Sequence, residues 1–314
     1  MNALLRQPCF FLAVCWVLMA ASPARAQASE AVPQFVQEFV GQGNLVRGRQ
    51  FSTSFEAVEE FSKFYIVPQN YRKTSSHNLS TEERVSGKYS HKAWIYGTNP
   101  TSSTENTNHR AYPTIQFSKS PLGIIRSAAL VELWVWADIE LRRSEGKSWF
   151  SLATLTSYDD VNWYRSYLIN VDADYRVHLM HVPRQGESAA DIVKQASIPL
   201  PRRKWVKITT YIDYGRNNRF QSPFIAVWQD GVVVAASRFS DRVSLDNVAP
   251  GNRPKCLNGW DGRDLERAES MCELKYTGGL AQAHFGLYAP PLLSSGVIFN
   301  DDLAVTEVLP GSKP

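Results

Sequence analysis

The sequence predicts an all-β protein, a two-sheet antiparallel jelly-roll sandwich, and three observations predict it. Apolar residues recur at every second position along most of the chain, whereas long runs with the helical period of 3.6 are missing. Turn signals rich in Gly, Asn, Asp and Pro separate these segments at even spacing. The length suits one large domain, because all-β sandwiches often contain about 200–250 residues.

The expected strands follow from this alternation. They are Phe51–Phe55, Arg84–Ser90, Lys92–Tyr96, Ala111–Phe117, Ala128–Leu141, Trp149–Thr156, Trp163–Val171, Tyr175–Val182, Trp205–Ile212, Phe224–Trp228, Val232–Arg238, Ala283–Tyr288 and Val297–Val305. The Asp230-Gly231 pair between two apolar runs is the strongest hairpin signal. Ser188–Ala196 and Arg263–Met271 are expected to form short helices within loops.

The N-terminal segment indicates export. Residues 1–26 contain Arg6, an apolar stretch with the run FFLAVCWVLMAA, and the small-residue pattern Ala24-Arg25-Ala26, which together are typical of a secretory signal peptide cleaved after Ala26. No later segment has the ~18 consecutive apolar residues of a membrane span. We therefore expect a periplasmic or secreted, soluble protein, with residues 27–50 as a leader and residues 51–314 as the jelly-roll domain.

The charge balance argues against nucleic acid as a partner. Without Arg6 and Arg25, the 34 basic residues fall to 32, against 30 acidic residues. Such a near-neutral chain has no broad positive field, although a local basic site for an acidic polymer remains compatible with it. We expect a monomer.

Two cysteines remain after removal of the signal peptide. Cys256 and Cys272 form an even pair in an oxidising compartment, so we expect a disulfide. The bond would close a loop of about 15 residues and contribute about 3 kcal/mol.

The stretch HRAYPTIQF, residues 109–117, is the most informative candidate for a functional strand. Its outer face would carry Arg110, Tyr112, Thr114 and Gln116, while the other face is apolar after its first residue. A guanidinium, a phenol and a carboxamide in a row can hold a carboxylate and move a proton beside it. A solvated outer face explains the same residues equally well. Pro113 cannot donate to a ladder, which predicts a bulge or an edge position.

Aromatic residues gather on other expected strands. In Ala128–Leu141 the alternation places Trp134 and Trp136 on the face opposite the core, where exposed aromatic stripes often mark binding surfaces. A loop of the same chain that covers them is the alternative. The strand 163–171 places Arg165 and Tyr167 on one side. Together these residues suit a concave groove for carbohydrate.

A resemblance follows from segments distributed over most of residues 51–308. They are SGKYSHKAWI (86–95), HRAYPTIQF (109–117), VELWVWADIEL (131–141), WFSLATL (149–155), VHLMHVP (177–183), WVKITTYIDY (205–214), VWQDG (227–231), HFGLYA (284–289) and FNDDLAV (299–305). In pattern this progression resembles the concanavalin-A-like jelly-roll polysaccharide lyases, a fold shared by heparin lyase I and by alginate and glucuronan lyases. HFGLYAPP is similar to the Phe-Lys-Ala-Gly-x-Tyr strand of alginate lyases. HRAYPTIQ resembles their Arg-x-Glu-Leu strand, with Tyr112 in place of Glu, and HLMH is the nearest segment to their Gln-x-His strand.

The resemblance implies β-elimination at a uronic acid of an acidic polysaccharide, without a required cofactor. Arg110 and Gln116 would then hold the sugar carboxylate. His181 would act as the base at neutral pH, and Tyr288 would act as base, acid or both. Tyr112, Trp134, Trp136, Arg165 and Tyr167 would contact the polymer.

Three alternatives remain open at this stage. A non-catalytic carbohydrate-binding jelly roll would use the tryptophans alone. A glycoside hydrolase is disfavoured because Trp136 occupies the position of the nucleophile in a run that resembles the Glu-x-Asp-x-x-Glu of jelly-roll glycosidases. A structural Ca²⁺ ion bound by Glu56 and residues 300–302 (Asn-Asp-Asp) is compatible with the sequence, as is a simple turn cluster.

Overall fold

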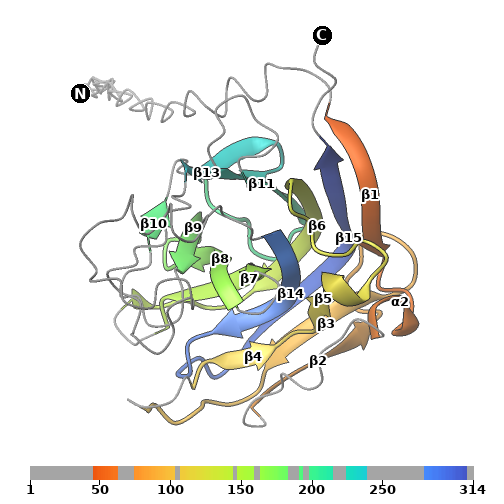
Figure 1. The fold of residues 1–314 in the computed structure, drawn as a ribbon. Helices are drawn as coiled ribbons and strands as arrows, with labels where there is room; N and C mark the ends of the chain where they lie inside the picture. Colours follow the sequence, from red (N-terminus) through yellow and green to blue (C-terminus); the bar gives the residue numbers. More distant parts are fainter. Residues whose placement is uncertain are drawn as a thin grey trace, which may run out of the picture.

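Two antiparallel sheets stacked face to face make up the part of the chain that the structure describes (Figure 1). In this computed structural model the described residues are 45–62, 74–102, 107–143, 147–158, 163–182, 191–193, 198–214, 224–238 and 279–309. The predicted all-β jelly-roll sandwich is confirmed. Within the described ranges, no helix has the length and apolar character needed to cross a membrane.

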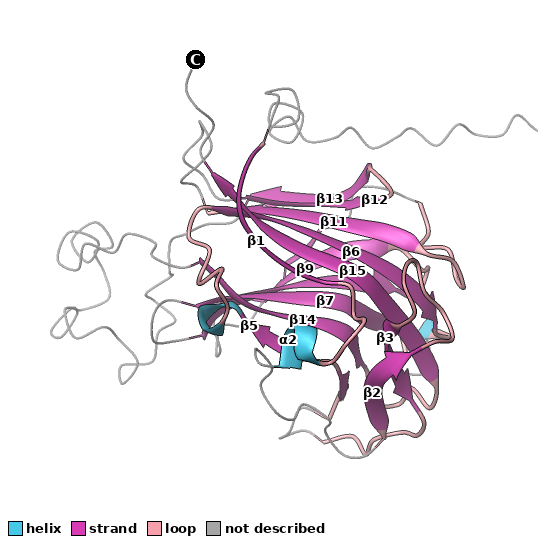
Figure 2. Cartoon of the chain, turned by 90° about the vertical axis from the view of Figure 1, so that its right-hand side faces the viewer, coloured by secondary structure: helices cyan, strands magenta, loops and turns pink. Residues whose placement is uncertain are grey.

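Sheet A has eight strands. In spatial order they are β13 (Val232–Arg238), β12 (Phe224–Gln229), β11 (Val206–Asp213), β6 (Ala128–Asp138), β15 (Gly296–Leu309), β3 (Ser90–Ile95) and β2 (Ser75–Ser80), with β1 (Val46–Thr53) also paired to β15. Figure 2 shows β13, β12, β11, β6 and β15 as one layer above β7 and β14.

Sheet B has seven strands. They are β10 (Asp191–Val193), β9 (Val177–Val182), β8 (Trp163–Asp172), β7 (Trp149–Tyr158), β14 (Gly279–Ala289) and β4 (His109–Ala111), with β5 (Thr114–Gln116) also paired to β14. The helices among the described residues are the four-residue α2 (Glu59–Ser62) and the 3₁₀ turn η1 (Phe117–Lys119).

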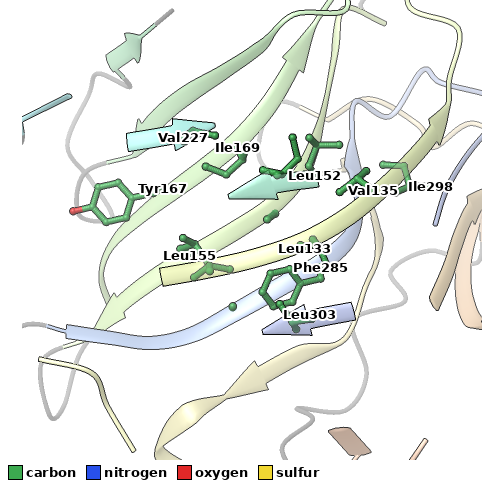
Figure 3. Close-up of a cluster of buried hydrophobic side chains, with 14 of the residues drawn as sticks. Leu133, Val135, Leu152, Leu155, Tyr167, Ile169, Val227, Phe285, Ile298 and Leu303 are labelled. Atoms are coloured by element: carbon green, nitrogen blue, oxygen red, sulfur yellow. The ribbon is translucent and has the colours of Figure 1, made fainter. Parts of the chain in front are cut away.

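One apolar core fills the space between the sheets. In β6 the side chains of Val131, Leu133 and Val135 point inward and are almost fully buried, and they share this cluster with Ile115 and Phe117. Figure 3 shows the same interior with side chains from both sheets. The predicted shared core of the two segments is therefore confirmed. Each strand has a second face, which is the outer face of its sheet.

Several boundaries differ from the predicted ones. The segment 111–117 is divided at Pro113 into β4 and β5, which agrees with the predicted bulge or edge. A strand over 84–90 is wrong, because bends occupy most of it, and β2 went unrecognised because SSHNLS has one apolar residue. β10 lies inside the segment predicted as a helix over 188–196. β1 begins at Val46, five residues inside the predicted leader.

Two of the acidic residues considered for Ca²⁺ accept hydrogen bonds from the backbone of a nearby loop. Asp301 accepts hydrogen bonds from the backbone N–H groups of Val85 (2.7 Å) and Ser86 (3.2 Å), and Glu56 accepts from that of Lys88 (2.9 Å). Within the described ranges no group of three or more His, Cys, Asp or Glu side chains is arranged to hold a metal ion. These carboxylates serve as acceptors for the loop 81–89, and a structural Ca²⁺ ion stays a prediction.

Candidate active site on the outer face of sheet B

The outer face of sheet B carries polar side chains from β4, β5, β7 and β14. Alternation explains their orientation, because Ala283, Phe285 and Leu287 of β14 belong to the core and the residues between them point outward. The register aligns them in rows across β4 or β5, β14 and β7. The rows are Arg110, Tyr288 and Ser151; Thr114, His284 and Thr154; and Gln116, Gln282 and Thr156.

Gly286 allows β14 to pass close to β4 between these rows. Its φ is +138°, a conformation that residues with a side chain rarely adopt. An added Cβ would lie 2.6 Å from the carbonyl oxygen of Ala111 and 2.9 Å from Cβ of Tyr112. The break of the ladder at Pro113 lies opposite this point. The glycine therefore brings Tyr112 against β14.

Tyr288 lies at the centre of the first row. Its phenol oxygen accepts a hydrogen bond from Nδ2 of Asn108 at 2.9 Å. The guanidinium carbon of Arg110 lies 5.9 Å from the centroid of the Tyr288 ring, and the Trp149 ring packs against it at 5.3 Å. The amide and the guanidinium both stabilise negative charge that develops near the phenol oxygen.

His284 completes the cluster and was not recognised from the sequence. Its ring lies 4.6 Å from that of Tyr112, which in turn lies 6.4 Å from that of Tyr288. Both ring nitrogens are buried and have no hydrogen-bond partner among the described residues. Burial, assisted by the positive charge of Arg110, lowers the pKa of His284 to about 3. The imidazole is therefore neutral, and it offers one donor and one acceptor.

The strand that carries Arg110 is anchored by its inward-facing neighbour. His109 is fully buried, and its Nε2 lies 2.9 Å from the carbonyl oxygen of Leu293. Its Nδ1 lies 3.3 Å from Oγ1 of Thr74 and 3.4 Å from Nδ2 of Asn99. These contacts join β4 to three loop positions, and so fix the backbone beside Asn108 and Arg110.

The strands around Tyr288 contain no acidic residue. β4, β5, β7 and β14 contain neither Asp nor Glu, and Arg110 is the one side chain among them that is charged at neutral pH. These strands together therefore carry positive charge.

Gln116 does not lie near Arg110. Arg110 pairs with Tyr288, and Gln116 pairs with Gln282, six residues away along β14. At about 3.3 Å per residue the two rows are roughly 15–20 Å apart. The predicted clamp of one carboxylate by both side chains is therefore not supported. Oε1 of Gln116 is buried without a partner among the described residues.

His181 lies far from Tyr288 in the register. It belongs to β9, which β8 and β7 separate from β14, so three strand spacings, about 14 Å, lie between them. It pairs with Tyr167, whose row continues through Leu155 to Ala283 rather than to Tyr288. The register does not support a joint action of His181 and Tyr288 on one sugar. The structure describes the backbone of His181 alone.

The predicted aromatic contacts also divide between different surfaces. Tyr167 is fully buried in the core, as Figure 3 shows, so it cannot contact a polymer and this prediction is corrected. Trp134 and Trp136 do lie on an outer face, but on that of sheet A, across the core from Arg110. They cannot line the same groove. The side chain of Arg165 and both cysteines of the predicted disulfide, Cys256 and Cys272, lie outside the described residues.

Comparisons with known proteins show no family for this chain, and the solved structures that align with it are distant. No family model and no curated protein sequence matches the chain. The crystal structure of an endo-β-1,4-glucuronan lyase from the fungus Trichoderma reesei aligns with 85% of this chain and 100% of its own, at 11% identity and a TM-score of 0.47. The cellulose-induced protein Cip1 aligns over 83% and 99%, at 14% identity and 0.48. Alginate lyase vAL-1 from a Chlorella virus aligns over 74% and 88%, at 10% identity and 0.43. At these identities the likeness concerns the arrangement of strands and assigns no activity.

Proposed function

We propose that this chain is an exported polysaccharide lyase that cleaves a uronic-acid-containing polysaccharide by β-elimination, with its active site around Tyr288. The observation that carries the proposal is the local geometry of that phenol. An amide donates to its oxygen at 2.9 Å, and a guanidinium lies 5.9 Å from its ring. These groups can stabilise an enolate-like charge on a sugar carboxylate and transfer a proton beside it.

The reaction is redox-neutral and needs no co-reactant. Arg110 binds the uronate carboxylate and withdraws charge from it, which makes the proton on the adjacent carbon more acidic. Tyr288 in its phenolate form takes that proton and becomes a phenol, the bond from the neighbouring carbon to the glycosidic oxygen breaks, and a carbon–carbon double bond forms. The leaving oxygen takes a proton from the same phenol. A single tyrosine thus serves first as base and then as acid.

His284, rather than the predicted His181, is the histidine that lies near Tyr288, and it acts in binding rather than as the base. With a pKa near 3, the imidazole stays neutral at neutral pH. It therefore does not compete with Arg110 for the carboxylate, and it does not repel the guanidinium of Arg110. The residue is partly exposed although both ring nitrogens are buried, so sugar hydroxyls, which offer both donors and acceptors, reach these nitrogens when a neighbouring side chain moves aside. Leaving such atoms unsatisfied is costly, so a bound sugar that pairs with them gains affinity.

A panel of polymers tests the proposal. Mature protein is incubated with glucuronan, alginate, heparinoids and a neutral glucan, and the ultraviolet absorbance of an unsaturated uronate is followed. The absorbance is expected to rise with at least one uronic polymer and to stay flat with the neutral glucan. Binding to uronic polymers without any rise in absorbance would instead assign the protein to non-catalytic carbohydrate binding.

A further inference from the structure

A pocket lies on the outer face of sheet A, remote from Tyr288. It has a volume of about 440 Å³, within the usual range of about 300–1,000 Å³ for ligand sites. It forms where β3, β6 and β15 meet the turn at residues 201–204. The side chains that matter here are Lys92, Trp94, Asp138, Glu140, Arg202 and Arg203.

The register explains why these residues meet. Val297 of β15 pairs with Trp94 of β3 on one side and with Asp138 of β6 on the other. Two residues further along β15, Phe299 lies between Lys92 of β3 and Trp136 of β6. The ring of Trp136 packs edge-on against that of Phe299, with centroids 5.2 Å apart. The pocket therefore continues into an aromatic face.

The pocket has a surplus of positive charge. Asp138 accepts hydrogen bonds from Arg202 at 2.5 Å and from Arg203 at 2.7 Å. Partial burial raises the pKa of Asp138, but the two arginines lower it more, so it stays below its usual value. Lys92 and Glu140 have partners of their own in Glu82 and Arg142. Two guanidinium groups thus share one carboxylate, which leaves one positive charge uncompensated.

The backbone of the turn is built to hold the two arginines there. Arg203 has a φ of +56°, in the left-handed region that few residues with a side chain adopt. Its N–H donates to the carbonyl oxygen of Ala137 at 3.0 Å. Its side chain is 70% exposed, and Asp138 is its one ion-pair partner among the described residues. A strained backbone that persists in this way often marks a functional position.

Arg202 is also oriented from a second direction. Its guanidinium carbon lies 5.7 Å from the centroid of the Tyr175 ring, and the hydroxyl of Tyr175 donates to the carbonyl oxygen of Ile139 at 2.7 Å. The arginine is therefore held by a carboxylate and an aromatic ring together. Trp94, partly exposed beside it, offers a flat apolar surface.

We propose that this pocket binds one carboxylated sugar unit of an acidic polysaccharide without cleaving it. The sugar ring packs on Trp94, and its carboxylate binds the guanidinium groups of Arg202 and Arg203 in competition with Asp138. The polymer class rests on the proposed function, whereas the site itself does not. Its role is to hold the protein on the polymer while the opposite sheet acts on another segment.

The test separates this pocket from the active site. Binding of glucuronan and alginate is measured by affinity electrophoresis in a Tyr288→Phe background, so that no polymer is cleaved. Arg203→Gln is expected to weaken binding roughly tenfold, the usual loss for a charged hydrogen bond. Trp94→Ala removes the stacking surface and is expected to weaken binding by a similar factor. Arg49→Gln is the matched control, because Arg49 is an exposed arginine paired with Glu307 at the other end of β15.

A third variant moves in the opposite direction. Asp138→Asn removes the competing carboxylate and is expected to raise affinity several-fold, which a structural role of Asp138 would not do. In the background with Tyr288 intact, cleavage of a short uronic oligosaccharide is expected to be unaffected by Arg203→Gln. Poly-L-glutamate serves as an anion without sugar rings, and Trp94→Ala is expected to leave its binding unchanged.

The outcomes are distinguishable. Polymer binding that is the same in wild type, Trp94→Ala and Arg203→Gln would overturn the pocket, whether or not cleavage occurs. An equal loss for poly-L-glutamate on Trp94→Ala would overturn the sugar assignment. Weakened polymer binding in a protein that never yields an unsaturated product would support the pocket and overturn the proposed lyase.

Discussion

The outer faces of the two sheets use charge in different ways. On and beside sheet A, cations whose side chains the structure describes meet carboxylates: Lys207 lies 2.6 Å from Glu132, and two arginines of the turn 201–204 share Asp138. On sheet B the strands around Tyr288 contain one arginine and no acidic residue. Paired charges at an exposed surface suit weak, reversible binding. A cation among buried polar groups suits stabilisation of a transient anion.

The largest expected effect tests whether chemistry is confined to sheet B. Tyr288→Phe removes the hydroxyl and keeps the ring that packs on Trp149, so folding and polymer binding should persist. Turnover is expected to fall about 10²–10⁴-fold, the usual contribution of a positioned acid–base group. Initial rates of ultraviolet absorbance measure it. Tyr96→Phe, an exposed tyrosine just beyond β3, is the control and should keep its rate.

The second effect tests the geometry of the cation on sheet B. Arg110→Lys keeps the charge, but a point ammonium cannot reproduce the bidentate fork for a carboxylate. The expected loss in kcat/KM is roughly 10- to 100-fold, the equivalent of one charged hydrogen bond. Arg49→Lys provides the comparison. A lysine variant with the wild-type rate would show that a positive charge at position 110 is sufficient. The outer face of sheet B would then not need the bidentate geometry that is proposed for Arg110.

Much of the fold could be predicted from the sequence because period-two alternation fixes which side chains face the core. Val131, Leu133 and Val135 illustrate this, and so does the hairpin at Asp230-Gly231 between β12 and β13. β2 escaped recognition because a polar edge strand lacks the alternation. Boundaries near Pro113 followed from its missing N–H, which is a local property.

The candidate site was less predictable because it depends on which strands become neighbours. Arg110 was identified from the face of its strand and Tyr288 from the resemblance of HFGLYAPP to a lyase strand, and the register places them side by side. His181 was chosen because it lies at a strand end, and His284 was not considered, yet pairing order puts β9 three spacings from β14. Alternation within β14 already placed His284 on the face of Tyr288. The face of His284 could be predicted from the sequence, but the pairing of strands distant in the sequence could not.

The third effect concerns two neighbouring histidines of sheet A, His77 of β2 and His91 of β3. Nε2 of His91 lies 3.1 Å from Nδ1 of His77, and an added Cβ at Gly286 would lie 3.1 Å from His91. Burial lowers the pKa of His77 to about 4 and that of His91 well below its usual value. The unfolded chain therefore binds protons between pH 6.5 and 4 that the folded protein does not. Stability falls with decreasing pH through this window, and the part that depends on His77 is fully lost near pH 4.

The size of the pH effect follows from the pKa of His77. A shift from 6.5 to about 4 corresponds to about 3 kcal/mol lost between these pH values, with a further contribution from His91 in the same direction. Urea unfolding at a series of pH values measures it. His77→Asn keeps a polar group near Nδ1 and should flatten the dependence. The charges of the sheet A pocket should survive this acidification, because the pKa of Asp138 is lowered.

The smallest expected effect asks how far the active region extends along β14. Gln116 lies roughly 15–20 Å from the row of Tyr288, so it can contact a neighbouring part of a bound chain but not the reacting sugar. Gln116→Ala should leave kcat unchanged and raise KM for long polymer about two- to tenfold, which corresponds to one neutral hydrogen bond. Short oligosaccharides that do not reach Gln116 should show no difference. A loss of kcat comparable to that of Arg110→Lys would mean that both side chains hold one carboxylate, and the separation inferred from the register would then be wrong.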